Sequence, residues 1–277
     1  KPIFPVLPSV INARKEIKTF LDKGNINFPD EVVLGKALTQ VYKTPMPISC
    51  VNELPILEVD KIKALITNAS NGYLSPEKAI ELLDLAGISR VEEVIISDKK
   101  VLETAISEMQ FPLVMKVVGP LHKSDANGVL LNLTSVDEIK KGFDQLMQIE
   151  KASGVLIQPM LSGLELFIGV KKEIGFNHTI LCGLGGIYIE VMNDVSAGLS
   201  PLSKVEISQM IKSLKGYKLI QGTRGQKGVN EDVFVDIIQR ISALVEIAPE
   251  IIEMDINPLI ASEEQITAVD VRIRIEK

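Results

Sequence analysis

The chain has 277 residues, of which 46% are hydrophobic and 24% are charged, as expected for a globular protein of one large domain or two ordinary ones. Its net charge of −6 argues against a nucleic-acid partner, since nucleic-acid-binding proteins normally carry a basic surface. The sequence has no apolar run of the ~20 residues that a membrane span needs, and no visible signal peptide. Cys50 and Cys182 lie far apart in unlike contexts, so we expect reduced thiols, a cytoplasmic location and no membrane partner.

Residues 1–43 have a strand–helix–strand–helix pattern. An apolar run at 3–7 and a short strand at 26–28 each precede a helix. The first helix is predicted at 12–22, and the second opens at 29–31 and carries apolar residues as far as Val41. This order is typical of a parallel α/β sheet but is too short to form one alone. Because Lys1 is not a methionine, we expect these residues to be the tail of a preceding domain in a longer polypeptide.

Residues 44–73 are predicted to be a linker. Pro45, Pro47 and Pro55 interrupt its first half, and a short helix at 60–69 and a turn complete it. Residues 74–277 then alternate between helical and strand patterns, with short turns that favour antiparallel pairs. The predicted helices are 75–86, 99–109, 135–149, 203–214 and 232–247, and the predicted strands are 91–96, 113–118, 129–133, 154–160, 164–171, 179–182, 187–192, 250–259 and 266–275.

The stretch 111–131 contains the most informative residues. Lys116 interrupts an apolar strand, and because burying an unpaired ammonium is costly, we expect it to meet an anion such as a nucleotide phosphate. The alternative is a strand-edge lysine whose stem reaches water. His122 follows in a polar segment between Gly119 and Gly128, where an imidazole of near-neutral pKa is suited to carrying a proton or a phosphoryl group. The alternative for His122 is an ordinary surface-loop histidine.

Acidic and amide side chains alternate near the C-terminal end. Glu253, Asp255 and Asn257 share one face of a predicted strand, and Asp270 can face them across a hairpin. Such oxygen ligands suit Mg²⁺, which takes one or two carboxylates together with phosphates. A solvated acidic face is the alternative. The glycines at 183–186 resemble a dinucleotide-binding turn, but no helix is predicted after them, so a tight turn is the simpler interpretation.

Six motifs occur in order between residues 75 and 274: K-V-V-G-P-L-H-K-S-D-A-N-G-V, V-L-I-Q-P-M, G-L-E-L-F-I-G-V, G-L-G-G-I-Y-I-E-V-M-N-D-V, E-M-D-I-N-P-L and V-D-V-R-I. Together they resemble the ATP-grasp domain of ADP-forming acyl-CoA synthetases (acetate–CoA ligases), relatives of succinyl-CoA synthetase. The resemblance implies an α/β fold. More specifically, it implies an α+β ATP-grasp domain with two subdomains, at roughly 74–150 and 151–277. It also implies that residues 1–43 are the remnant of a flavodoxin-like succinyl-CoA-ligase domain.

The resemblance also assigns roles and cofactors, ATP or ADP and Mg²⁺. Lys116 matches the lysine on the nucleotide phosphates, and His122 matches a second phosphohistidine, which Lys123 could neutralise once it is phosphorylated. The remaining matches are Gln158 at the adenine edge, Glu165 as an acid of the nucleotide site, Gly185 in the glycine loop, and Asp255, Asn257 and Asp270 on the metal.

In that family an acyl-CoA and phosphate give an acyl phosphate, and its phosphoryl group passes through histidine to ADP. The expected partners are therefore a CoA-binding domain or subunit of the same enzyme, CoA and a small carboxylic acid, while a homo-oligomer stays possible. Three positions depart from the family pattern, namely Asn127-Gly128, Pro159 and Ala197-Gly198. The last two remove a carboxylate and a cation, which leaves an alternative open: a degenerate, non-catalytic nucleotide-binding module, for example one fused to a protein acetyltransferase.

Overall fold

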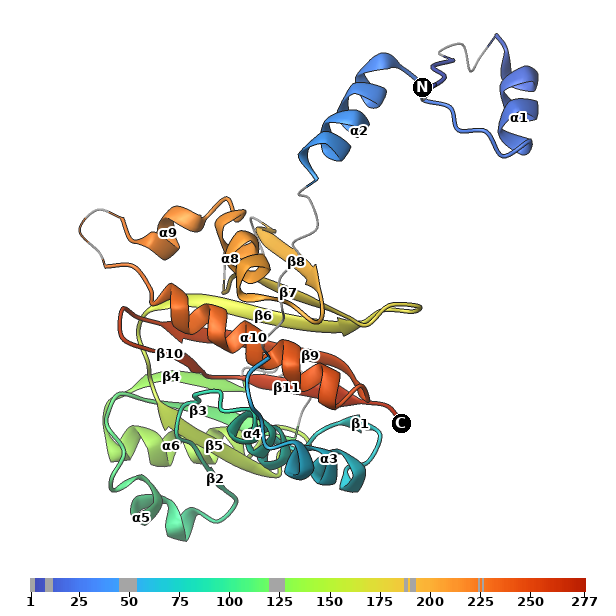
Figure 1. Ribbon diagram of the computed structural model, residues 1–277. Coiled ribbons are helices and arrows are strands. Elements are labelled where there is room, and N and C mark those ends of the chain that lie inside the picture. The colour runs from blue at the N-terminus through green and yellow to red at the C-terminus, as the bar shows by residue number, and fades with distance from the viewer. Residues whose placement is uncertain are drawn as a thin grey trace. The chain divides into compact units, whose positions relative to one another are not determined.

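The computed structural model describes residues 3–7, 12–44, 54–119, 128–186, 189, 193–223, 225 and 227–277. The chain divides into two compact units, residues 1–49 and residues 50–277 (Figure 1). In the described part of the chain, no helix combines the length and the apolar character needed to cross a lipid bilayer.

The first unit contains helices α1 (Arg14–Asp22) and α2 (Glu31–Lys43). Asp30 caps α2, because its side chain accepts a hydrogen bond from the main-chain nitrogen of Val33 at 2.7 Å. A parallel bridge joins Val6 to Phe28, as expected for the strand–helix–strand order seen in the sequence. Most apolar side chains of this unit are exposed in the described residues, and Ile17 is its buried hydrophobic residue.

The second unit contains two antiparallel sheets. The small sheet has the order β2-β5-β3-β4, formed by β2 (Val94–Ile96), β5 (Gly154–Pro159), β3 (Leu113–Val118) and β4 (Val129–Leu133). Its helix-covered face packs against η1 (Lys99–Val101), α5 (Leu102–Ile106) and α6 (Val136–Leu146) around a core that includes Met115, Ile139 and Ile157. Because side chains alternate along a strand, Val114 and Lys116 on β3 and Gln158 on β5 lie on the opposite face.

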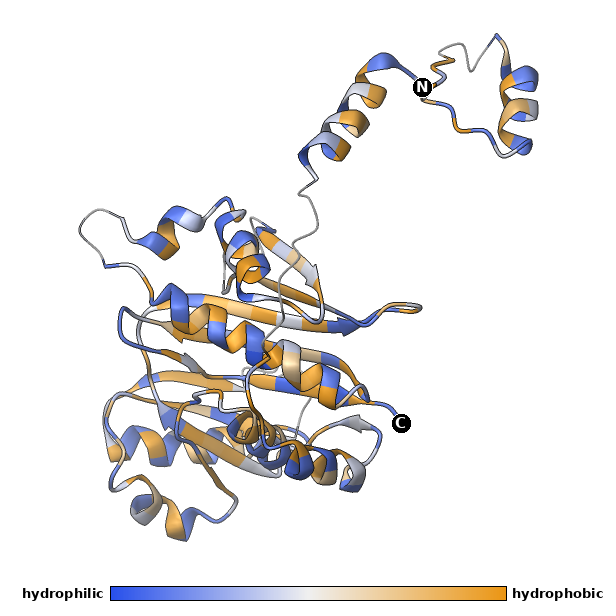
Figure 2. Cartoon of the chain, in the orientation of Figure 1, coloured by the Kyte–Doolittle hydropathy of each residue, from blue (hydrophilic) through white to orange (hydrophobic). Residues whose placement is uncertain are grey.

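The large sheet has the order β1-β11-β9-β6-β7-β8, and β10 pairs with β9. Its strands are β1 (Gly72–Tyr73), β6 (Leu164–Lys172), β7 (His178–Leu184), β8 (Val195–Leu199), β9 (Ile251–Ala261), β10 (Ile266–Ala268) and β11 (Val271–Ile275). The main core packs on one face of this sheet, against α3 (Val59–Asn68), α4 (Pro76–Leu85), α8 (Lys204–Lys212), α9 (Tyr217–Gln221) and α10 (Glu231–Ile247). Hydrophobic and hydrophilic residues alternate along α6 and α10, as in amphipathic helices that cover a sheet (Figure 2).

Several elements differ from the sequence prediction. The strand predicted at 266–275 is divided into β10 and β11, with Val269 and Asp270 between them. Strand β5 pairs with β2 and β3, so the change of sheet follows β5 and does not fall at residue 150. Helix α3, inside the predicted linker, contributes Ile62 to the main core. In the segment predicted as a strand at 187–192, Ile189 is the described residue and it is helical.

Candidate functional site

Lys116 is buried between the two sheets. It lies on β3, an inner strand of the small sheet, and is 8% exposed. Its Nζ atom donates a hydrogen bond to the main-chain oxygen of Val269 at 3.2 Å, in the connection between β10 and β11. The lysine is therefore not the strand-edge residue of the alternative interpretation.

Gln158 lies beside Lys116 and is 1% exposed. It pairs with Val114 on β3, so its side chain is diagonal to that of Lys116 on the same face of the small sheet. Pro159 pairs with Leu113, which is buried in the helix-covered core. The carboxylate that the family pattern has at position 159 would thus start on the opposite face from Gln158, so its loss removes no group from the Lys116 face.

Asp255 and Asn257 lie on β9, and Asp270 lies in the connection between β10 and β11. Asp255 is exposed whereas its neighbour Ile256 is buried, as the predicted alternation requires. The main-chain nitrogen of Asn257 donates to the main-chain oxygen of Asp270 at 3.1 Å, which sets these residues opposite each other. Arg272 is the direct strand partner of Asp255.

The carboxylate of Asp255 is in an environment that disfavours its charged form. Although the residue as a whole is exposed, partial burial of its carboxyl raises the pKa of Asp255. Arg272 lowers this pKa, whereas repulsion from Asp270 and Glu253 raises it further. In the part of the chain that the structure describes, no three His, Cys, Asp or Glu side chains lie together as a metal-binding group. A cation here would therefore have two carboxylates, the Asn257 amide and ligand oxygens around it, a set that suits Mg²⁺.

Glu165 and Gly185 lie next to this group. The main-chain nitrogen of Gly185 donates to the main-chain oxygen of Glu165 at 2.8 Å. A Cβ on Gly185 would lie 3.2 Å from Oδ1 of Asn257 and 2.8 Å from the main-chain oxygen of Leu166, and Gly186 has φ +58°. The turn thus needs glycine, as the simpler interpretation of the glycine cluster predicts. Glu165 also lines a groove of about 780 Å³ together with Thr223 and Lys227.

Gly198 has a different environment from the one inferred from the sequence. A Cβ on Gly198 would lie 2.7 Å from Sδ of Met210 and 2.8 Å from a methyl carbon of Leu202, under helix α8. An arginine at this position would therefore start in the packed core. The inference that Gly198 deletes a cation from a phosphate site is wrong in this chain, because position 198 lies on the helix-covered face of the sheet and not on the face of Asp255.

His122 and Lys123 lie outside the described residues. The described residue before this segment, Gly119, has φ +124°, and a Cβ there would lie 2.1 Å from the main-chain oxygen of Lys151. Only glycine fits at this end of β3. One polar residue of the site was not found from the sequence: Glu93 lies near Gln158, and only its position inside the strand predicted at 91–96 could have drawn attention to it.

Two antiparallel sheets with a buried lysine between them agree with the architecture expected of an ATP-grasp domain. A family model described as an ATP-grasp domain matches residues 66–275. The chain belongs to this family and is the ATP-grasp portion of an ADP-forming acyl-CoA synthetase.

The relatives that support this assignment are acetate–CoA ligases. The chain is 36% identical over 215 residues to the beta subunit of ADP-forming acetate–CoA ligase I of Pyrococcus furiosus, which covers 74% of this chain and 93% of that subunit. It is 40% identical over 195 residues to ADP-forming acetate–CoA ligase II of Archaeoglobus fulgidus, covering 69% of this chain but only 29% of that protein.

A solved structure has the same architecture. The dinucleotide-forming acetyl-coenzyme A synthetase 1 of Ca. Korarchaeum cryptofilum, in complex with coenzyme A, Ca-AMPCP and HgCl⁺, matches with a TM-score of 0.71 and 32% identity. The match covers 78% of this chain and 99% of that chain. The two-sheet unit of this chain therefore has the fold of an experimentally determined relative.

Proposed function

We propose that this chain transfers a phosphoryl group reversibly between ADP or ATP and a phosphohistidine, as the nucleotide-binding part of an acid–CoA ligase that interconverts acyl-CoA and free acid. The observation that carries the proposal is the contact between Lys116 and the connection that holds Asp270. It brings the predicted phosphate-binding lysine, at 3.2 Å from the oxygen of Val269, to within one residue of the predicted metal ligand.

The chain's own side chains fit a magnesium nucleotide. Lys116 supplies the positive charge that phosphoryl transfer needs, and Gln158, which lies beside it on the same face of the small sheet, would meet the adenine edge. Asp255, Asn257 and Asp270 would hold Mg²⁺, whose charge would offset the burial and the repulsion that raise the pKa of Asp255. When bound, the metal neutralises charge on the nucleotide phosphates.

The glycine turn and Glu165 complete the site. Gly185 has no side chain to block a ligand beside Asn257, and the carboxylate of Glu165 lies against Gly186. We assign Glu165 to the nucleotide site on this position. Another solved structure of the Ca. Korarchaeum cryptofilum enzyme contains coenzyme A and Mg-AMPPCP, with a phosphohistidine segment pointing towards the nucleotide-binding site (TM-score 0.66, 33% identity). It supports ATP or ADP with Mg²⁺ as the ligands of this chain.

His122 is the proposed phosphoryl carrier. In the transfer to ADP, the N–P bond of phosphohistidine breaks while a terminal oxygen of the β-phosphate bonds to phosphorus, and the imidazole leaves with its electron pair. Lys123, the next residue, would neutralise the phosphorylated ring.

The partner in this proposal is a CoA-binding domain or subunit. Relatives of this chain occur as separate beta subunits and as parts of longer proteins, which supports either arrangement. We propose that residues 1–43 are the tail of a flavodoxin-like domain, since the parallel bridge between Val6 and Phe28 is the connection such a domain contains. The domain limits of 44–73 for a linker and 74–277 for the ATP-grasp part remain proposals.

The test is phosphoryl labelling. The chain is incubated with Mg-[γ-³²P]ATP, and acid-labile label on His122 is measured in wild type and in His122→Asn, with ADP binding followed by calorimetry. Label that disappears in the variant while ADP still binds supports the proposal. Wild type that binds Mg-ATP but takes no label would contradict the transfer step, and wild type that binds no nucleotide would contradict the whole assignment.

A further inference from the structure

We propose that Glu93 is a positioning residue for Lys116 and that it acts through the side-chain amide of Gln158. The proposal rests on the proposed function, because it concerns the lysine that meets the nucleotide phosphates. Glu93 belongs to none of the six sequence motifs, and it lies just before strand β2.

Gln158 lies between the two charged groups. When its amide nitrogen faces the carboxylate and its oxygen faces the ammonium, Nε2 donates to Oε2 of Glu93 at 3.1 Å and Oε1 accepts from Nζ of Lys116 at 3.3 Å. The opposite orientation would place an acceptor against a carboxylate and a donor against an ammonium, and both contacts would be repulsive. The two charges therefore select one orientation of the amide.

Burial makes this orientation important. Gln158 is 1% exposed and Lys116 is 8% exposed, and polar groups removed from water are stable only when they are paired. Lys116 also donates to the oxygen of Val269 at 3.2 Å. Acceptors on the two sheets, Gln158 on one and Val269 on the other, thus set the direction in which the ammonium points.

The backbone that carries Glu93 is held at both ends. On one side, the nitrogen of Val91 donates to the oxygen of Ala268 at 2.9 Å, which ties the segment to the large sheet. On the other side, Val94 pairs with Ile157 in the small sheet. Glu93 therefore occupies the crossing between the two sheets and has little freedom to leave Gln158.

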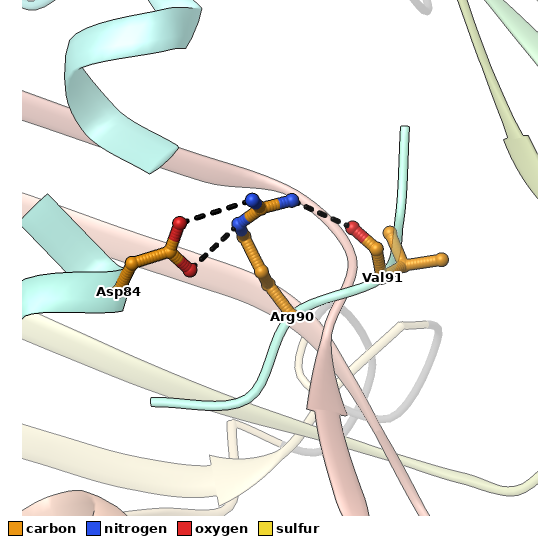
Figure 3. A network of polar contacts seen from close by, with 3 residues as sticks. All are labelled: Asp84, Arg90 and Val91. Atoms are coloured by element: carbon orange, nitrogen blue, oxygen red, sulfur yellow. Dashed lines mark hydrogen bonds and ion pairs between the residues drawn. The ribbon is translucent and has the colours of Figure 1, made fainter. Parts of the chain in front are cut away.

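Arg90 strengthens the first of these anchors. Its guanidinium donates to both carboxylate oxygens of Asp84 on α4, at 2.9 Å and 3.0 Å, and to the oxygen of Val91 at 3.3 Å (Figure 3). A two-bond arginine–carboxylate contact fixes orientation better than a single bond. Helix α4 thus holds the chain at Val91, two residues before Glu93.

The test is a double-mutant cycle on ADP binding, measured by calorimetry. Glu93→Gln, which keeps the shape and removes the charge, should weaken ADP binding about tenfold, the order expected for a hydrogen bond to a charged group. In a Lys116→Met background the same change should have no effect. The matched control is Glu92→Gln, an exposed neighbour, which should leave ADP affinity unchanged in both backgrounds. Equal losses from Glu93→Gln with and without Lys116 would overturn the proposal.

A second measurement does not depend on nucleotide. In NMR spectra of the free chain, the side-chain NH₂ of Gln158 should exchange slowly in wild type and in Glu92→Gln, and faster in Glu93→Gln. An unchanged exchange rate in Glu93→Gln would overturn the positioning role by itself. If wild type binds no ADP, the proposed function fails, and the exchange rates still decide the role of Glu93.

Discussion

The Nζ atom of Lys116 and the main-chain oxygen of Val269 are hydrogen-bonded at 3.2 Å, although they belong to different sheets and are 153 positions apart in the chain. Val269 and Asp270 form the short connection between β10 and β11. The same bond therefore joins the two sheets and sets the proposed phosphate-binding lysine beside a proposed metal ligand. A change at Lys116 should therefore affect both the site and the stability of the fold.

The first prediction concerns Lys116→Met. Methionine keeps most of the stem and removes the ammonium, so ADP affinity should fall by about tenfold or more, because hydrogen bonds to charged groups are worth ~1.5–3 kcal/mol. The free energy of unfolding should also fall, because removing one partner of a buried polar contact leaves the acceptors of Gln158 and Val269 without their donor. Calorimetry and urea unfolding measure the two effects. Lys141→Met, at an exposed position of α6, is the control and should change neither.

The second prediction concerns the metal. Asp270→Asn removes one of the two proposed carboxylate ligands, so it should weaken the binding of Mg-ADP far more than that of metal-free ADP. Calorimetry with and without Mg²⁺ gives both values. Glu276→Gln, on an exposed C-terminal residue, should leave the ratio at its wild-type value. If Asp270→Asn reduced both affinities by the same factor, Asp270 would have no part in holding the metal.

Local patterns in the sequence predicted most of the second unit. Period-two alternation was sufficient to place Asp255 on the exposed face and Met254 in the core, because one face of β9 is covered by helices. The ATP-grasp assignment rested on motifs and is confirmed by the family match over residues 66–275. Composition was less reliable at Ile189, whose β-branched side chain favoured a strand but which is helical.

Contacts between distant parts of the chain could not be predicted in this way. Strands β3 and β4 and helix α6 separate Glu93 from Gln158 in the sequence. Their contact depends on β2 and β5 being neighbours in the small sheet. The environment of Gly198 depends in the same way on α8, which covers β8. The family resemblance suggested that a cation is missing at Ala197-Gly198, but only the packing shows which face Gly198 occupies.

The third prediction tests that correction. Gly198→Arg should lower the free energy of unfolding by ~1–3 kcal/mol or more, because its Cβ would lie 2.7 Å from Sδ of Met210 in a packed core. It should not increase ADP affinity. Ala197→Arg is the matched control: this neighbouring position is exposed, so stability should change little. Tighter ADP binding by Gly198→Arg, measured by calorimetry, would show that position 198 does reach the nucleotide.

The last prediction concerns the pH dependence of stability and His178. This residue is 3% exposed, and its Nε2 donates to the main-chain oxygen of Ile251 at 2.7 Å. Burial lowers the pKa of His178, with Lys172 acting in the same direction, while the Ile251 hydrogen bond and Glu246 partly oppose the shift. Since the unfolded chain has a histidine pKa near ~6.5, the unfolded state takes up the proton first as the pH falls.

The contribution of His178 to stability is therefore fully present above the unfolded pKa and is lost as the pH falls to the folded pKa. The free energy of unfolding of wild type, measured in urea, should drop more between about pH 7.5 and about pH 5 than that of His178→Gln. Carboxylates titrate in both proteins, so the difference between them isolates the histidine. His122→Gln, which changes the chain's other histidine, should keep the wild-type pH dependence. If His178→Gln and wild type lost stability in parallel over this range, the folded state would have no preference for the neutral form of His178.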